Sequence, residues 1–143
     1  MKTILVPIDF SASTPAVVKA AEDFGRGPQT RIVLITATRP PVVLNENAPD
    51  IEDFIRRDRD NAGRKMAACG AKLAADGFDV EPVVRFGPPV ECILEEARRI
   101  HADYIVMGSH GHTAIYELFV GGTTAGVLKV APCPVLVVPT KRI

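Results

Sequence analysis

The chain has 143 residues, the usual size of one compact domain, and its 17 Lys and Arg balance its 17 Asp and Glu to a formal charge of zero. This balance excludes the basic field that drives binding to nucleic acid, and a content of 47% hydrophobic and 24% charged residues excludes a disordered chain. Its apolar runs are far shorter than the ~20 residues of a membrane-spanning helix, so we expect neither a nucleic acid nor a membrane as partner.

The first half of the chain alternates strand-like and helix-like segments. Residues 4–7 form a short apolar run typical of a strand buried on both faces, and residues 11–15 supply a hydroxyl cap and Pro15 for a helix that runs to about Phe24. Residues 31–36 predict a second strand, whereas the three prolines and two asparagines of residues 37–49 predict a long loop. Asp50 is expected to cap a helix that ends near Gly77.

The second half continues the alternation. Residues 80–86 predict a third strand, which Pro82 places at or near a sheet edge because proline donates no hydrogen bond. Residues 90–101 predict a helix and residues 104–107 the fourth strand. Thr123 or Thr124 is expected to cap a last helix through Val130, before a final strand at residues 135–138. This order predicts one α/β domain over residues 1–143, a doubly wound parallel sheet with helices on both faces.

The N-terminal segment and the cysteines give weaker indications of location and of metal or redox chemistry. The N-terminus passes directly into an apolar segment without a cleavage site, which favours a cytoplasmic location. Cys69, Cys92 and Cys133 include no C-x-x-C pair, so we expect buried thiols rather than a zinc or redox site.

Three loops at the carboxyl ends of the predicted strands are candidates for a ligand site: residues 7–9, residues 36–38 and the stretch from Gly108 onward. In the third, Gly108 and Gly111 precede Gly121 and Gly122, which open a helix. Glycines at a helix N-terminus leave backbone N–H groups open to a phosphate. The pattern therefore indicates either phosphate binding or glycines that only permit turns, and it has neither a Walker A lysine nor the Rossmann spacing.

Few side chains near these loops are suited to catalysis. Asp9 can accept hydrogen bonds from a ribose or an adenine amino group, and the alternative is an ordinary loop or capping aspartate. His110 and His112 lack visible further metal ligands, which favours exposed loop histidines. No serine lies in a nucleophile elbow, so we predict no catalytic residue and no metal site.

Over essentially its whole length the chain resembles the universal stress proteins. The resemblance rests on the segments Ile4-Leu5-Val6-Pro7-Ile8-Asp9, Ile105 to Gly111 and Cys133 to Val138, and on a G-x2-G-x9-G pattern met by Gly108, Gly111 and Gly121. It implies the five-stranded parallel sheet of the adenine nucleotide alpha hydrolase-like fold, binding of ATP or AMP with Mg²⁺ or Mn²⁺ carried by the nucleotide, and a homodimer joined through the last strand, Val135, Leu136, Val137 and Val138.

The resemblance also implies which residues contact the nucleotide. Pro7 and Asp9 would lie against the nucleoside, Ala37 would line the adenine pocket, and Met107 and Gly108 would meet adenine and ribose. The phosphates would be held by Gly111, Gly121, Gly122 and Thr123, and the same loops add Ile8, His110 and Thr124 to the expected site. Gly122 departs from the family pattern, which has Ser or Thr there. A hydrogen bond lost at this position would weaken binding by about 1.5–3 kcal/mol unless Thr123 or Thr124 replaces it.

These observations predict a cytoplasmic stress-response module that binds an adenine nucleotide. Any ATP hydrolysis should be slow, because no residue is an evident base for activating water. The alternative is a homodimeric interaction protein that binds no nucleotide and acts through an unidentified protein partner. Gly122 favours the alternative, whereas the three spaced glycines and Asp9 favour the nucleotide.

Overall fold

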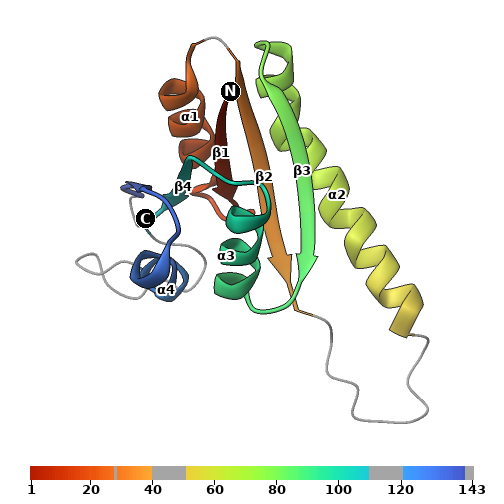
Figure 1. The fold of residues 1–143 in the computed structure, drawn as a ribbon. Helices are drawn as coiled ribbons and strands as arrows, with labels where there is room; N and C mark the ends of the chain where they lie inside the picture. The colour runs from red at the N-terminus through yellow and green to blue at the C-terminus, as the bar shows by residue number, and fades with distance from the viewer. Residues whose placement is uncertain (28, 40–50, 110–120, 141–143) are drawn as a thin grey trace.

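The computed structural model describes residues 1–27, 29–39, 51–109 and 121–140, and within them strands and helices alternate as expected (Figure 1). The strands are β1 (Lys2–Pro7), β2 (Thr30–Thr38), β3 (Asp79–Phe86), β4 (Tyr104–Gly108) and β5 (Val135–Val138). The helices are α1 (Thr14–Gly25), α2 (Ile51–Ala75), α3 (Pro89–Arg99) and α4 (Gly122–Val130).

The five strands form one parallel sheet in the order β3-β2-β1-β4-β5. The chain winds outward from β1 to β3 and then crosses to β4, so the strand order reverses between β1 and β4. Pro82 lies in β3, which is an edge strand as predicted, because the edge tolerates a residue without an N–H donor. The predicted α/β fold with a five-stranded parallel sheet is confirmed.

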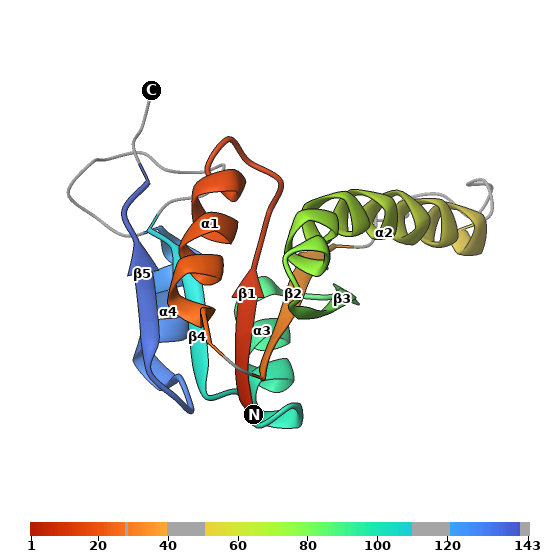
Figure 2. The same cartoon turned by 90° about the horizontal axis from the view of Figure 1, so that it is seen from above.

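Helices cover both faces of the sheet (Figure 2), and successive residues of β1 show how the two cores form. Ile4 and Val6 join a buried cluster with Val17 of α1 and Met66 of α2. Leu5 points to the opposite face, into a second cluster that α3 and α4 complete. All three side chains are fully buried, which explains why β1 is continuously apolar from Ile4 to Val6 instead of alternating.

Some local predictions need correction. Residues 36–38 are not a loop, because β2 stays paired with β3 as far as Thr38 opposite Phe86. Ser13 holds the N-cap position of α1 but makes no capping bond through its side chain. The last helix has Gly121 at its N-cap, so neither Thr123 nor Thr124 caps it. The expected cap at Asp50 and the rest of the loop from residue 40 lie outside the described residues.

The cysteines are less uniform than expected. Cys92 is buried, whereas Cys69 and Cys133 are only partly buried, and all three are free thiols. Burial raises the pKa of each thiol, which leaves little reactive thiolate at neutral pH. Within the described ranges, no helix is long and apolar enough to cross a bilayer.

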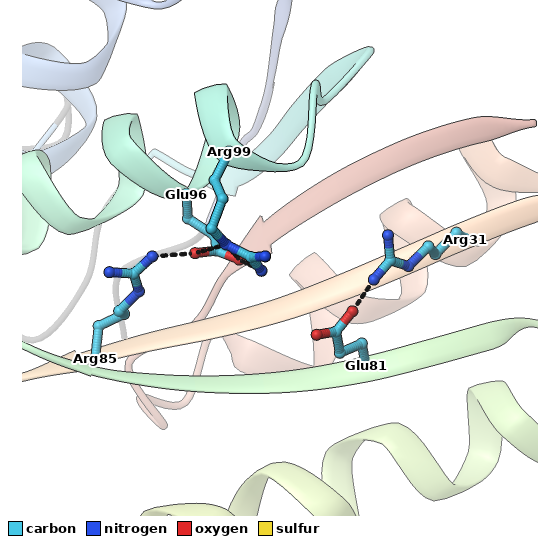
Figure 3. A network of polar contacts seen from close by, with 5 residues as sticks. All are labelled: Arg31, Glu81, Arg85, Glu96 and Arg99. Atoms are coloured by element: carbon cyan, nitrogen blue, oxygen red, sulfur yellow. Dashed lines mark hydrogen bonds and ion pairs between the residues drawn. The ribbon is translucent and has the colours of Figure 1, made fainter.

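A buried carboxylate joins α3 to the edge strand β3 (Figure 3). Glu96 is fully buried, and its carboxylate accepts a hydrogen bond of 2.5 Å from Arg85 of β3 and hydrogen bonds of 3.1 Å from Arg99 Nε. Burial raises the pKa of Glu96, but the hydrogen bonds from Arg99 and Arg85 outweigh it and leave that pKa below its usual value. Arg31 of β2 pairs with Glu81 of the neighbouring edge strand β3.

Helices α3 and α4 approach each other closely at Gly126. A Cβ at this position would stand 2.8 Å from a methyl carbon of Val90 in α3, closer than packed atoms allow. Gly63 in α2 offers the opposite case, since a Cβ there would have no neighbour within 4 Å. Only the first glycine is required by packing.

The Gly126→Ala variant should therefore lose about 1–3 kcal/mol of unfolding free energy through overpacking against Val90. The matched Gly63→Ala variant should gain about 0.5–1 kcal/mol, because alanine favours the helix and has room. Urea denaturation of both variants measures the two changes. Equal stabilisation by the two alanines would contradict the close helix contact.

The Glu96 network predicts a pH dependence of stability. A carboxylate whose pKa is lowered by folding stabilises the protein above the unfolded pKa of about 4.3, and this contribution is lost as the pH falls below that value. Glu96→Gln should cost about 1–3 kcal/mol at neutral pH and should lose less further stability between about pH 6 and pH 3 than the native chain.

Denaturant unfolding at several pH values measures this difference. Glu95→Gln is the control, because Glu95 is an exposed neighbour on the same helix. Its stability should fall with acid as in the native chain. Parallel pH profiles for the native chain and Glu96→Gln would show that the network does not depress the pKa of Glu96.

Candidate functional site

A cavity of about 220 Å³ lies at the carboxyl ends of β1 and β4, where the strand order reverses. This is the place at which open α/β sheets bind ligands. Its wall contains, from β1 to α4, Pro7, Ile8, Asp9, Ser11, Ser13, Thr14, Val17, Ile35, Ala37, Pro89, Ile93, Met107, Gly108, Gly121, Gly122, Thr123 and Thr124.

The first wall is the end of β1 and the turn that follows. The N–H of Ile8 donates to the carbonyl of Ile35 (2.8 Å), which extends the β1–β2 pairing to the edge of the cavity. Asp9 is exposed, and its carboxylate accepts a hydrogen bond from the N–H of Ser11 (3.0 Å). Phe10 between them has φ +59°, a conformation that costs energy in a non-glycine residue. Asp9 thus stabilises the turn after β1 through its hydrogen bond with Ser11 and also lies on the cavity wall.

The second wall is the start of α4, which two hydrogen bonds join to the end of β4. The N–H of Gly121 donates to the carbonyl of Ser109 (2.6 Å), and the hydroxyl of Thr124 donates to the carbonyl of Gly108 (2.7 Å). Thr124 is buried, and its hydroxyl proton is used in this bond. Of the two threonines, Thr123 is the exposed one. Thr123, rather than Thr124, is therefore the candidate to replace a hydroxyl missing at Gly122.

The N-terminus of α4 presents open donors to the cavity. No side chain caps this helix, and the first N–H groups of a helix have no acceptor within it. Gly122 and Thr123 occupy these positions and are exposed on the cavity wall. Their N–H groups and the helix dipole favour a bound anion.

Sequence reasoning missed the hydroxyl-bearing wall formed by Ser11, Ser13 and Thr14. Thr14 is buried, and its Oγ1 has no hydrogen-bond partner in the part of the chain that the structure describes. The signal that could have found these residues was their place directly after Asp9, at the end of a strand already expected to bear the site. Pro89 and Ile93 of α3, together with Val17 and Ile35, add apolar surface that no motif marked.

Most of the predicted site residues come together in this cavity. Pro7, Ile8 and Asp9 of the first loop, Ala37 of β2, Met107 and Gly108 of β4, and residues 121–124 all line it. His110 and Gly111 lie outside the described residues. Asp9 is the one ionisable side chain on the described wall, so an anion there would be held mainly by N–H and hydroxyl groups rather than by cationic side chains.

The chain is similar to known proteins over nearly its whole length. The model of the universal stress protein family matches residues 1–139. A universal stress protein from Thermus aquaticus is 36% identical over 141 residues, which cover 96% of this chain and 98% of the relative.

Solved structures show the same architecture. That of MJ0577, a universal stress protein of Methanocaldococcus jannaschii, matches with a TM-score of 0.84 and 29% identity over 99% of this chain and 98% of its own. A universal stress protein solved in complex with cAMP matches with a TM-score of 0.72 and 24% identity over 98% of each chain. The family match over residues 1–139 and the shared fold together establish that this chain belongs to the universal stress protein family.

Proposed function

We propose that this universal stress protein binds an adenine nucleotide, ATP or AMP, in the cavity between β1, β4 and α4. The observation that carries the proposal is the uncapped N-terminus of α4 on the cavity wall, where Gly122 and Thr123 present N–H groups. Phosphate oxygens accept hydrogen bonds from such groups. The relative solved with cAMP supports the same class of ligand.

The remaining walls suit the nucleoside. Ala37, Met107 and Ile93 provide apolar surface for a base, and Asp9 is the acceptor for a ribose hydroxyl or the adenine amino group. Ser11 and Ser13 follow Asp9 closely in the sequence and line the same cavity. In this arrangement the cavity encloses the nucleoside, and the phosphates lie at the exposed rim formed by the start of α4.

The site is proposed as a regulatory binding site with at most slow hydrolysis. Asp9 is the one ionisable group on the described wall, and its carboxylate already accepts the N–H of Ser11. Within the described residues, His, Cys, Asp and Glu form no group of three that could hold a metal ion. Mg²⁺ or Mn²⁺ is proposed to be carried by the phosphates, whose oxygens are ligands of the kind these ions prefer. A nucleotide-bound and a nucleotide-free form would be the two states of a stress-response module.

Position 122 gives the sharpest test, because a Cβ there would have no neighbour within 4 Å among the described residues. Gly122→Ser restores the hydroxyl of the family pattern, and one hydrogen bond to a charged phosphate should tighten ATP binding by about 10- to 100-fold. Gly122→Asp has the same room but places a carboxylate against the phosphates, so it should weaken binding by at least about tenfold. Calorimetric titration with ATP and Mg²⁺ measures all three chains.

The two variants control for each other because both fit without a clash. If the native chain, Gly122→Ser and Gly122→Asp bound ATP with the same affinity, the phosphates would lie away from α4. If neither the native chain nor Gly122→Ser bound ATP at millimolar concentration, the nucleotide proposal would fail. The alternative of an interaction protein that acts through a protein partner would then stand.

We further propose that the chain forms a homodimer through β5. This strand is an edge of the sheet, and Leu136 on it is 38% exposed. Leu128 and Val130 of the preceding helix are also exposed large apolar residues. An unpaired apolar edge invites association, and pairing with a second copy covers it.

Leu136→Lys should convert the dimer to a monomer, because it places a charge in the proposed interface. Phe54→Lys is the control, since Phe54 is exposed on α2, away from β5. Sedimentation velocity at several concentrations should show a dimer for the native chain and the control and a monomer for Leu136→Lys. A native chain that stays monomeric over the whole range would contradict the dimer.

A further inference from the structure

A second cavity, of about 580 Å³, lies at the opposite end of the sheet from the nucleotide cavity. It is formed by the end of α1, the start of β2 and the turn from α2 to β3. Figure 1 shows these segments gathered near the N-terminus, whereas the arrowheads of β2 and β3 point to the other end of the molecule. The two cavities therefore do not share a wall residue.

Hydrogen bonds fix the walls of this cavity. The hydroxyl of Thr30 donates to the carbonyl of Gly25 (2.7 Å), which holds the end of α1 against the start of β2. On the other side, the N–H of Phe78 donates to the carbonyl of Leu73 (3.1 Å), and Gly77 turns the chain with φ +95°. The cavity is built by the fold and needs no rearrangement to form.

Glu22 of α1 lines this cavity and presents its carboxylate to it. The residue is only 9% exposed, and no described residue gives its carboxylate a hydrogen bond or an ion pair. Two cations of the same helix end pair with Asp23 instead, Lys19 at 3.2 Å and Arg26 at 3.0 Å. A carboxylate without a protein partner on the wall of a cavity is a strong hydrogen-bond acceptor for a cation that enters it.

The rest of the wall favours an organic cation. Asp76 and Asp79 add two exposed carboxylates, and the cationic groups of the described wall residues are the Arg26 side chain and the α-amino group of Met1. The half-buried ring of Phe78 adds an aromatic surface of the kind that attracts ammonium groups. Within the described residues the acidic groups do not gather closely enough to hold a metal ion. Carboxylates spread over the wall of a large cavity suit an elongated cation with more than one ammonium group.

We propose that this second cavity binds a small aliphatic polyamine. One ammonium group donates to the carboxylate of Glu22, and a second donates to Asp76 or Asp79 at the rim. The site is separate from the nucleotide cavity, so it stands whether or not the nucleotide proposal holds.

The test is a titration of the native chain with spermidine at about physiological salt, followed by calorimetry and by the amide NMR signals of Thr30 and Gly77. We expect saturable binding to one site, with shifts at both amides. Glu22→Gln keeps the shape of the side chain and should weaken binding by at least about tenfold. Its unfolding free energy should not fall, because Glu22 has no partner to lose.

Two further variants distinguish specific binding in this cavity from non-specific attraction of spermidine to acidic side chains. Glu95→Gln removes an exposed carboxylate of α3 and should leave the affinity unchanged. Arg26→Gln removes positive charge from the wall and should tighten spermidine binding several-fold. If Arg26 had only a structural role, this substitution would not tighten binding.

Three results would overturn the proposal. The first is the absence of saturable binding at millimolar spermidine, and the second is equal weakening by Glu22→Gln and Glu95→Gln. The third is the same shifts at Thr30 and Gly77 with Mg²⁺ alone, which would assign the cavity to a metal ion. If Glu22→Gln failed to fold, Asp79→Asn would replace it, and an unchanged affinity in that variant would count against the site.

Discussion

The start of α4 is joined to the end of β4 by two hydrogen bonds, from the N–H of Gly121 to Ser109 and from the hydroxyl of Thr124 to Gly108. The proposed ligand site depends on this junction, because it places the uncapped helix N-terminus beside the strand ends where the sheet order reverses. It also gives the two threonines different roles. Thr124 holds the junction together, and Thr123 stays exposed beside Gly122. The phosphate-binding capacity proposed for the protein thus follows from backbone geometry rather than from cationic side chains.

The fold could be predicted from the sequence largely because its buried strands and glycine-marked turns are local signals. In a chain of alternating elements, an apolar run such as residues 4–7 indicates a central strand, and Pro82 indicates an edge strand. Helix starts were harder to predict, since Ser13 and Thr123 have good capping side chains that the structure does not use as caps. The extension of β2 to Thr38 was also missed, because it depends on pairing with β3, a non-local contact that β2 residues alone do not reveal.

The site was predicted where a motif or a family resemblance marked it, and missed where packing decides. Glycines at 108 and 121 and the carboxylate of Asp9 carry recognisable patterns, and all three lie on the cavity wall. Pro89 and Ile93 reach the cavity from α3, whose place depends on non-local contacts with the sheet, with Arg85 and with Gly126. Glu22 could not be predicted as a site residue for the same reason. It lines a cavity together with residues of the α2–β3 turn, and no sequence motif marks this non-local arrangement.

The central claim is that phosphates bind at the start of α4, and a crystal structure of the chain grown with ATP and Mg²⁺ tests it most directly. The account predicts phosphate oxygens within hydrogen-bond distance of the N–H groups of Gly122 and Thr123, with adenine near Ala37 and Met107. It also predicts that the bond from Thr124 to Gly108 is retained. A cavity without nucleotide at saturating ATP, or phosphates bound away from α4, would contradict the account.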